Sequence, residues 1–373
     1  MKKILFLTGT RADFGKLKSL IKKVEAHTSF EAYIFVTGMH MLAKYGLTAN
    51  EVERSGFSNI YKYINQNSCD SMDMILSKTI HGLSDYVKEL NPDMIVVHGD
   101  RVEAMAGAIV GSLNNCLVAH IEGGEVSGTI DELIRHSVSK MSHIHFVSNE
   151  SAKSRLLQMG EVSDNVFTIG SPDLDIMTSD SLPSIVDVKS RYGFDFDSYA
   201  VFMYHPVTTE PTSLQKNISQ VVDALISSAE NYIVIFPNND QGSDTIIEEL
   251  KRLRGNERFR IYPSIRFECF LTIIKNGKFM VGNSSAGVRE VPFYGIPTIN
   301  IGTRQNNRAN SKTVMNVGED SNSILEAIQS CEGLERIVVR EFGDGSSDEK
   351  FLSVIESDDV WQTKHQKVFV DRL

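Results

Sequence analysis

The chain has 373 residues, more than a single hydrophobic core usually supports, so we expect two domains. Its 41% apolar and 23% charged residues are ordinary for a globular protein, and its four widely spaced cysteines argue against a disulfide framework or a structural zinc site. A net charge of −10 argues against nucleic acid as a partner, because such proteins normally present a basic surface.

Apolar runs rich in Val, Ile and Phe recur along the chain and leave room for a helix between them. The first is too short for a signal peptide or a membrane span, so we expect a cytoplasmic protein with no membrane partner. Parallel strands of two sheets are predicted. They cover residues 4–7, 32–36, 94–97, 117–121, 144–147 and 166–169 in the first half, and 199–204, 233–236, 260–262, 279–281, 298–301 and 337–339 in the second.

Helical patterns lie between these runs. Met72, Leu76, Ile80, Leu83, Val87 and Leu90 share one face of a helix, and Leu214, Ile218, Val221 and Leu225 repeat the pattern. Residues 171–198, which contain Pro172 and Pro183, are predicted to form an irregular linker. The fold class is therefore α/β, with two doubly wound, Rossmann-like domains that face a cleft. Their limits are residues 1–170 and 171–373, and the last helix is a candidate for packing back on the first domain.

Polar residues follow the first strand, where an open α/β sheet holds its ligands. The turn Gly9-Thr10-Arg11-Ala12-Asp13 opens a helix that carries Lys16, and such a helix start can bind phosphate with the help of Arg11. The alternative is a surface ion pair between Arg11 and Asp13. No G-x-G-x-x-G motif occurs here, so a nicotinamide cofactor is not indicated.

Carboxylates follow the third and fourth predicted strands of the first half. Asp100 lies in His98-Gly99-Asp100-Arg101, and Glu122 and Asp131 belong to the segment 120–131, which contains several glycines. Carboxylates gathered at neighbouring strand ends could remove and return a proton, and glycine allows a ligand to approach closely. The structural alternative is that Asp100 pairs with Arg101 and Asp131 caps the following helix.

The second half carries candidate nucleotide ligands after its strands. His205, followed by Pro206, could bind a diphosphate or move a proton, although a lone histidine usually has a local structural role. Asn238 lies in an amide-rich turn suited to a base edge or to closing a loop.

The segment Gly282-Asn283-Ser284-Ser285 is expected to begin a helix whose N-terminus binds a diphosphate, with Glu290 on the ribose. An ordinary serine N-cap with a structural glutamate is the alternative. Pro292 is expected to limit or kink this helix.

These segments together resemble the hydrolysing UDP-N-acetylglucosamine 2-epimerases, including the epimerase domain of the bifunctional enzyme of animal sialic-acid synthesis. The matching segments span nearly the whole chain, and residues 121–130 are the most specific. They are Arg11-Ala12-Asp13, His98-Gly99-Asp100-Arg101, residues 120–131, Arg135-His136, His205-Pro206-Val207-Thr208-Thr209, Gly282-Asn283-Ser284-Ser285, Gly287-Val288-Arg289-Glu290 and Gly302-Thr303-Arg304-Gln305.

The resemblance implies the two-domain architecture of GT-B glycosyltransferases, with UDP held mainly by the second domain and the sugar facing the first. It implies elimination of UDP to 2-acetamidoglucal and rehydration to N-acetylmannosamine, with no cofactor or metal, in a homo-oligomer (a dimer or a dimer of dimers). The implied catalytic residues are Asp100, Glu122, Asp131 and His205. The implied UDP-sugar ligands are Arg11, Lys16, Arg101, Asn238, Gly282, Ser284, Ser285, Glu290 and Arg304.

Three alternatives stay open. The same branch includes hydrolysing enzymes that act on UDP-N,N'-diacetylbacillosamine for legionaminic acid. A GT-B glycosyltransferase would share Ser284, Ser285 and Glu290 but would not need the carboxylates of the first domain. A non-catalytic nucleotide-sugar sensor would not need the proton-transfer residues. Incubation with UDP-N-acetylglucosamine separates these classes.

Overall fold

The computed structural model describes residues 1–67, 69–127, 130–179, 182–305, 312–331, 334 and 336–371. The chain forms two compact units. Unit 1 contains residues 1–125, 131–179 and 341–373, and unit 2 contains residues 126–130 and 180–340. Among the described residues, no helix is long and apolar enough to cross a membrane.

Unit 1 is built on a parallel sheet in the order β3-β2-β1-β4-β5-β6-β7. β2 and β3 lie on one side of β1, and β4 to β7 lie on the other side. The switch point of this Rossmann-like fold is therefore between β1 and β4. The strands are β1 (Lys2–Thr8), β2 (Phe30–Val36), β3 (Ile60–Lys62), β4 (Met94–His98), β5 (Leu117–Ile121), β6 (Ile144–Val147) and β7 (Val166–Thr168). The helices are α1 (Arg11–Ala26), α2 (Ala49–Arg54), α3 (Met72–Leu90), α4 (Val102–Leu113), α5 (Ile130–Met141), α6 (Glu150–Gln158), α7 (Pro172–Met177), α14 (Ser347–Glu356) and α15 (Asp358–Trp361).

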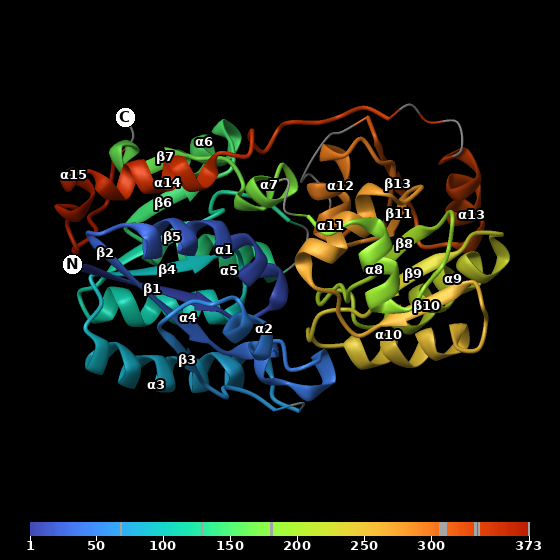
Figure 1. Ribbon diagram of the computed structural model, residues 1–373, viewed down its shortest axis with the longest axis horizontal. Coiled ribbons are helices and arrows are strands. Elements are labelled where there is room, and N and C mark those ends of the chain that lie inside the picture. The colour runs from blue at the N-terminus through green and yellow to red at the C-terminus, as the bar shows by residue number, and fades with distance from the viewer. Residues whose placement is uncertain are drawn as a thin grey trace. The chain divides into compact units, whose positions relative to one another are not determined.

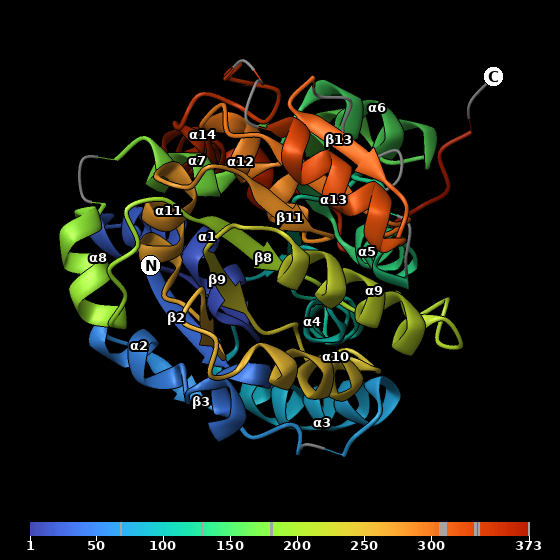
Figure 2. The ribbon, with the colours of Figure 1, turned by 90° about the vertical axis from the view of Figure 1, so that its right-hand side faces the viewer.

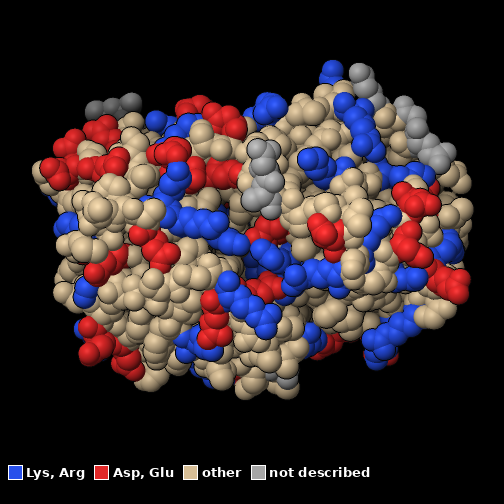
Figure 3. All heavy atoms as spheres, viewed as in Figure 1, with Lys and Arg blue, Asp and Glu red and all other residues tan. Residues whose placement is uncertain are grey.

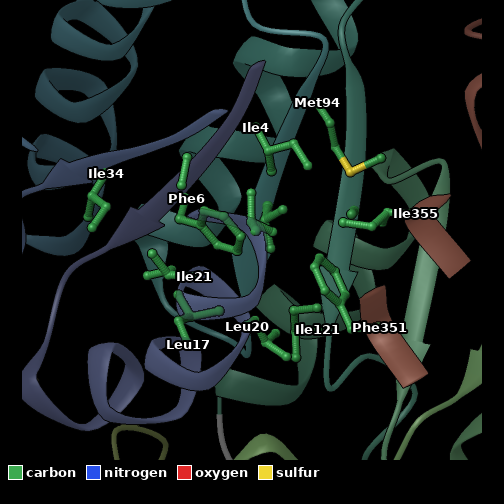
Figure 4. Close-up of a cluster of buried hydrophobic side chains, with 14 of the residues drawn as sticks. Ile4, Phe6, Leu17, Leu20, Ile21, Ile34, Met94, Ile121, Phe351 and Ile355 are labelled. Atoms are coloured by element: carbon green, nitrogen blue, oxygen red, sulfur yellow. The ribbon is translucent and has the colours of Figure 1, made fainter. Parts of the chain in front are cut away.

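Helices cover both faces of this sheet, with α1 and α14 on one face and α3 and α4 on the other (Figure 1). Side chains alternate along each strand, so Phe6 points to the α1 face, where Leu20 and Phe351 complete a buried cluster (Figure 4). Leu7 points to the opposite face, against Gly107 of α4. Because both faces are buried, the strands are continuous apolar runs.

Unit 2 repeats the design with a parallel sheet in the order β10-β9-β8-β11-β12-β13, whose switch point lies between β8 and β11. Figure 2 shows α9, α10 and α13 side by side across one face of the sheet. The strands are β8 (Ala200–Met203), β9 (Tyr232–Ile235), β10 (Phe259–Tyr262), β11 (Met280–Gly282), β12 (Thr298–Ile301) and β13 (Val314–Val317). The helices are α8 (Ile185–Tyr192), α9 (Leu214–Ser227), α10 (Ser243–Leu250), α11 (Phe267–Lys275), α12 (Glu290–Phe293) and α13 (Ser321–Ser330).

The predicted fold class of two Rossmann-like parallel sheets is confirmed, and so are all but one of the predicted strands. Residues 337–339 are not a strand: Ile337 and Val338 are exposed, and the Val339 N–H donates to the carbonyl of Pro292 instead of to a sheet. The α9 stripe is buried as predicted, whereas the buried face of α3 is centred on Ile75, Thr79, Gly82, Leu83 and Val87.

The predicted linker at residues 171–198 is not wholly irregular, because α7 and α8 lie within it. Pro172 is the first residue of α7, a position where its missing N–H costs nothing. Residues 180 and 181 of this stretch lie outside the described residues.

The compact units differ from the limits 1–170 and 171–373, because α7 and the last part of the chain belong to unit 1. The Ser171 N–H donates to the Phe342 carbonyl at 2.7 Å. Asp175 of α7 accepts hydrogen bonds from the backbone N–H groups of Ser347 and Asp348 at 2.8 and 3.0 Å, which caps α14. The chain therefore returns to unit 1 after completing unit 2.

Candidate active site

The turn between β1 and α1 lies beside the switch point of unit 1. Thr10 caps α1, and the Asp13 carboxylate accepts from the backbone N–H groups of Gly9 and Thr10 at 2.9 and 3.0 Å. Arg11 pairs with Glu51 at 2.7 Å, whereas the suggested alternative was a pair with Asp13. The carboxylate of Asp13 shapes the turn because it satisfies backbone donors at the helix start.

Glu122 follows β5 in a conformation that is unusual for a residue with a side chain. Its φ is 63°, in the left-handed region, and the residue is 4% exposed. Its N–H donates to the Phe146 carbonyl at 2.8 Å. Gly123 comes next, and a Cβ atom at that position would lie only 2.8 Å from His120 Nδ1. Such a backbone costs on the order of 1–3 kcal/mol and persists only where surrounding contacts enforce it, most often at functional sites.

The Glu122 carboxylate is held by side chains from three other segments. Ser171 donates to Oε1, and His98 Nε2 lies 3.0 Å from Oε2. Lys16 Nζ lies 3.6 Å from the same Oε2 and 3.2 Å from the Asp173 carboxylate. All three ionisable groups, Lys16, Glu122 and Asp173, are less than 10% exposed, so the single ammonium of Lys16 lies beside two buried carboxyl groups.

The residues around Glu122 include some that were not predicted from the sequence. Lys16 is expected among the UDP-sugar ligands, and the structure places its ammonium group beside Glu122, on the inner side of α1. Ser171 and Asp173 were not singled out, because both lie in the stretch predicted to be a linker, about 50 residues from Glu122 along the chain. His98 belongs to a matching segment, but its contact with Glu122 was not predicted from the sequence.

Asp100 pairs with Arg135 of α5, which is 2% exposed and also donates to the Glu125 carbonyl at 3.3 Å. Arg101, its suggested partner, lies 3.6 Å from the buried Glu103.

Asp131 is the second residue of α5, one turn before Arg135, and a carboxylate in a first helical turn is favoured by the helix dipole. Asp131 is therefore inside the helix, not at its cap. Residues 128 and 129 of the matching segment lie outside the described residues.

His120 fixes the turn that carries Asp100. The ring is fully buried, with Nε2 2.8 Å from the Gly99 carbonyl and Nδ1 3.0 Å from the Ser139 hydroxyl of α5. Burial lowers the pKa of His120 to about 3, so the ring is neutral at physiological pH. β5, α5 and the Asp100 turn are thereby joined through one side chain.

In unit 2, His205 and Asn238 come together after β8 and β9. The backbone N–H of Asn238 donates to His205 Nδ1 at 3.1 Å. Asn283, after β11, accepts from the His205 N–H at 2.6 Å and donates to the His205 carbonyl at 2.9 Å. The structure therefore groups three polar residues at neighbouring strand ends on both sides of the unit 2 switch point.

The segment after β11 differs from the prediction. No α-helix begins at Ser284: residues 285–287 form a single 3-10 turn capped by Ser284, whose hydroxyl accepts from the Ala286 N–H at 3.3 Å. α12 starts only at Glu290 and has four residues, with Pro292 inside it. The α-helix whose dipole was expected to act at Ser284 is therefore absent. Ser285 is half-buried beside Ser284, and Glu290 is 4% exposed.

Gly282 and Arg304 support this segment from two sides. Gly282 has φ 135°, and a Cβ there would lie 2.0 Å from the Met203 carbonyl oxygen, so only glycine fits. Arg304 is 7% exposed and donates to the Asn283 carbonyl at 3.3 Å. Gln305 Nε2 donates to the same carbonyl at 2.9 Å. Contacts of Arg304 with the protein backbone were not foreseen from the sequence.

Charges of both signs are interspersed on the face drawn in Figure 3, where Lys and Arg side chains lie among Asp and Glu side chains. Within the described part of the chain, no group of three or more His, Cys, Asp and Glu side chains is placed to hold a metal ion.

Several known proteins similar to this chain are named as epimerases of nucleotide sugars. The family model described as UDP-N-acetylglucosamine 2-epimerase matches residues 22–356. A UDP-N-acetylglucosamine 2-epimerase of Neisseria meningitidis serogroup B is 47% identical over 375 residues, covering 100% of this chain and 99% of the relative. The UDP-N,N'-diacetylbacillosamine 2-epimerase (hydrolyzing) of Legionella pneumophila is 32% identical, covering 96% of each chain. The crystal structure of a UDP-GlcNAc 2-epimerase from Neisseria meningitidis bound to UDP-GlcNAc has a TM-score of 0.81 at 18% identity, covering 95% of this chain and 99% of that one, which shows the shared fold.

Proposed function

The chain belongs to the UDP-N-acetylglucosamine 2-epimerase family, and we propose that it is a hydrolysing member, which converts UDP-N-acetylglucosamine and water to UDP and N-acetylmannosamine. The C2 proton and UDP leave across the C1–C2 bond to give 2-acetamidoglucal. Water then adds its oxygen to C1, and C2 is protonated on the opposite face. We place this reaction early in sialic-acid synthesis, as the motif resemblance implies.

The relatives support the hydrolysing reaction. The full-length relative at 47% identity is named for the UDP-N-acetylglucosamine substrate. The Legionella relative, at 32% identity, is named as hydrolysing. Together they favour a nucleotide sugar as substrate and release of the free 2-epimer.

The observation that carries the proposal in the structure is the setting of Glu122. Its carboxylate is buried on a strained backbone, beside Lys16 and His98, at the end of a central strand. Proton removal from carbon requires a positioned base, and its return on the other face requires a positioned acid. We assign these roles collectively to Glu122, Asp100 and Asp131.

We assign UDP binding chiefly to unit 2. We place the His205 imidazole at the diphosphate, where a ring N–H can donate a hydrogen bond to the leaving oxygen. The remaining proposed ligands of the UDP-sugar are those of the resemblance: Arg11, Lys16, Arg101, Asn238, Gly282, Ser284, Ser285, Glu290 and Arg304. A homo-oligomer and a cytoplasmic location remain predictions.

UDP-N,N'-diacetylbacillosamine is the second candidate substrate, because the Legionella relative is named for it. The two substrates share the UDP and the 2-acetamido group and differ on the sugar ring at C4 and C6. The same elimination would then give the 2-epimer of the diacetylated sugar.

The test is to incubate the purified protein with each nucleotide sugar and to identify the products by NMR. We expect UDP and free N-acetylmannosamine, with kcat/KM at least tenfold higher for UDP-N-acetylglucosamine than for the bacillosamine derivative. The reverse ratio would favour the second candidate. Accumulation of UDP-N-acetylmannosamine would contradict hydrolysis, and binding without turnover would favour a sensor. Turnover only with an added sugar acceptor would favour a glycosyltransferase.

A further inference from the structure

Asn283 holds both polar backbone groups of His205. It follows β11 and is fully buried. Its Oδ1 accepts from the His205 N–H at 2.6 Å, and its Nδ2 donates to the His205 carbonyl at 2.9 Å. One side chain therefore fixes the backbone of a residue about 80 positions earlier, across the ends of β8 and β11.

Asn283 is itself held in place by its neighbours. Its carbonyl accepts from Arg304 Nη1 at 3.3 Å and from Gln305 Nε2 at 2.9 Å, both in the segment after β12. The preceding residue, Gly282, lies so close to the Met203 carbonyl that no side chain fits. The loops after three neighbouring strands are thus joined at this one asparagine.

The imidazole ring of His205 is oriented by Asn238. The Asn238 N–H donates to Nδ1 at 3.1 Å, and the Asn238 side-chain oxygen lies 3.2 Å from the same nitrogen. The amide of Asn238 is fixed in turn by Asp240 at 2.5 Å. Nδ1 therefore has an acceptor partner when it is protonated and a donor partner when it is not, so the ring keeps its orientation in both states.

We propose that Asn283 is a positioning residue that fixes the His205 backbone, so that Asn238 can engage Nδ1 and direct Nε2 at the leaving diphosphate. This inference rests on the proposed function, which supplies the diphosphate. Asn283 acts only through His205 and does not touch the reacting atoms.

The experiment compares Asn283→Asp and Asn283→Ala with the matched control Asn231→Asp. Asn231 donates its side-chain amide to the Ser198 carbonyl at 3.0 Å, but at the amino-terminal end of β9. We expect kcat for UDP release to fall at least about tenfold in the Asn283 variants, because the loss of one hydrogen bond at a charged ligand has an effect of this size. In the control, kcat should stay within about twofold of the parent value.

A double-mutant cycle with His205→Asn separates positioning from general damage. If Asn283 acts through His205, Asn283→Asp should cost less than about twofold in the His205→Asn background. Effects that multiply in the double variant would overturn the proposal. If His205→Asn itself leaves kcat unchanged, the role of His205 in the proposed function fails, and with it this inference.

A measurement on the parent protein decides the case if the Asn283 variants do not fold or if the parent turns over no nucleotide sugar. The bond from the His205 N–H to Asn283 predicts an amide protected from hydrogen exchange at least a hundredfold relative to exposed loop amides. UDP should also shift the ¹⁵N resonance of His205 Nε2 more than that of Nδ1. Rapid exchange, or a larger shift at Nδ1, would overturn the proposal without bearing on whether the chain is an epimerase.

Discussion

Glu122 and Glu161 offer a controlled comparison of two buried carboxylates within unit 1. Both are less than 5% exposed, and each lies near a histidine and a lysine. Glu122 contacts His98 at 3.0 Å and Lys16 at 3.6 Å. Glu161 contacts His145 at 2.9 Å and Lys140 at 2.8 Å, but it follows α6 and lies away from the switch point. Only Glu122 stands on a left-handed backbone.

Replacement of each glutamate by glutamine should therefore have different consequences. We expect Glu122→Gln to lower kcat about a hundredfold to ten-thousandfold, because the amide cannot exchange a proton, and to leave UDP affinity within about threefold. Glu161→Gln should lower the thermal midpoint and leave kcat of the folded enzyme within about twofold. Steady-state kinetics, calorimetry with UDP and thermal melts check both expectations. Equal losses of activity in the two variants would show that Glu122 has only a structural role.

Residue types and strand ends could be predicted from the sequence, but side-chain partners could not. Asp100 and Glu122 follow central strands as expected, since apolar runs predict strands and strand ends carry the polar residues. The partners of Glu122 depend on how α7 packs against α1, which brings Asp173 to Lys16. Local sequence does not encode such distant contacts.

At the scale of elements, the errors concern short or exposed segments. β3 has three residues and lies at a sheet edge, and β13, also at an edge, has the polar Asn316 within it. Neither is a continuous apolar run, so both were missed. Residues 337–339 are apolar but exposed, and the predicted helix at Ser284 is a single 3-10 turn. Buried central elements are predictable because burial on both faces dictates their composition.

The return of α14 to unit 1 has a measurable consequence. Phe351 is fully buried, with its ring 4.8 Å from that of Phe146 on β6 and 6.4 Å from that of Phe6 on β1. Phe351→Ala should lower the free energy of unfolding of unit 1 by about 3–5 kcal/mol, through lost burial and the cavity that remains. The control is Phe369→Ala, whose side chain is 86% exposed and whose loss should cost less than about 0.5 kcal/mol.

Urea unfolding followed by Trp361 fluorescence provides the measurement, because this single tryptophan lies in α15 of unit 1. An unchanged unfolding midpoint in Phe351→Ala would contradict the assignment of residues 341–373 to the core of unit 1. Two transitions are expected when both units are monitored by circular dichroism, since each has its own core.

At the scale of the whole molecule, buried histidines make stability depend on pH. Burial lowers the pKa of His40 to about 4 and that of His120 to about 3, from an ordinary value of 6.5. Below pH 6.5 the unfolded chain therefore takes up protons that the folded chain does not, and stability falls as the pH falls. Each histidine should cost about 2 kcal/mol between pH 7 and pH 5.

Urea unfolding at pH 7 and pH 5 checks this expectation with His40→Asn as the test variant. The variant should lose less stability between the two pH values than the parent does, whatever its stability at pH 7. His81→Asn is the control, because the His81 side chain is exposed. A parent equally stable at the two pH values would show that these rings are not held neutral.

The central claim is an elimination at C2 followed by hydration, and turnover of UDP-N-acetylglucosamine in deuterated water tests it most directly. Breaking the C2–H bond at the proposed carboxylates and rebuilding it with a proton from solvent must place deuterium at C2 of the released sugar. We therefore predict UDP and N-acetylmannosamine with one deuterium at C2, observed by NMR and mass spectrometry. Release of N-acetylmannosamine that retains protium at C2 would contradict the account.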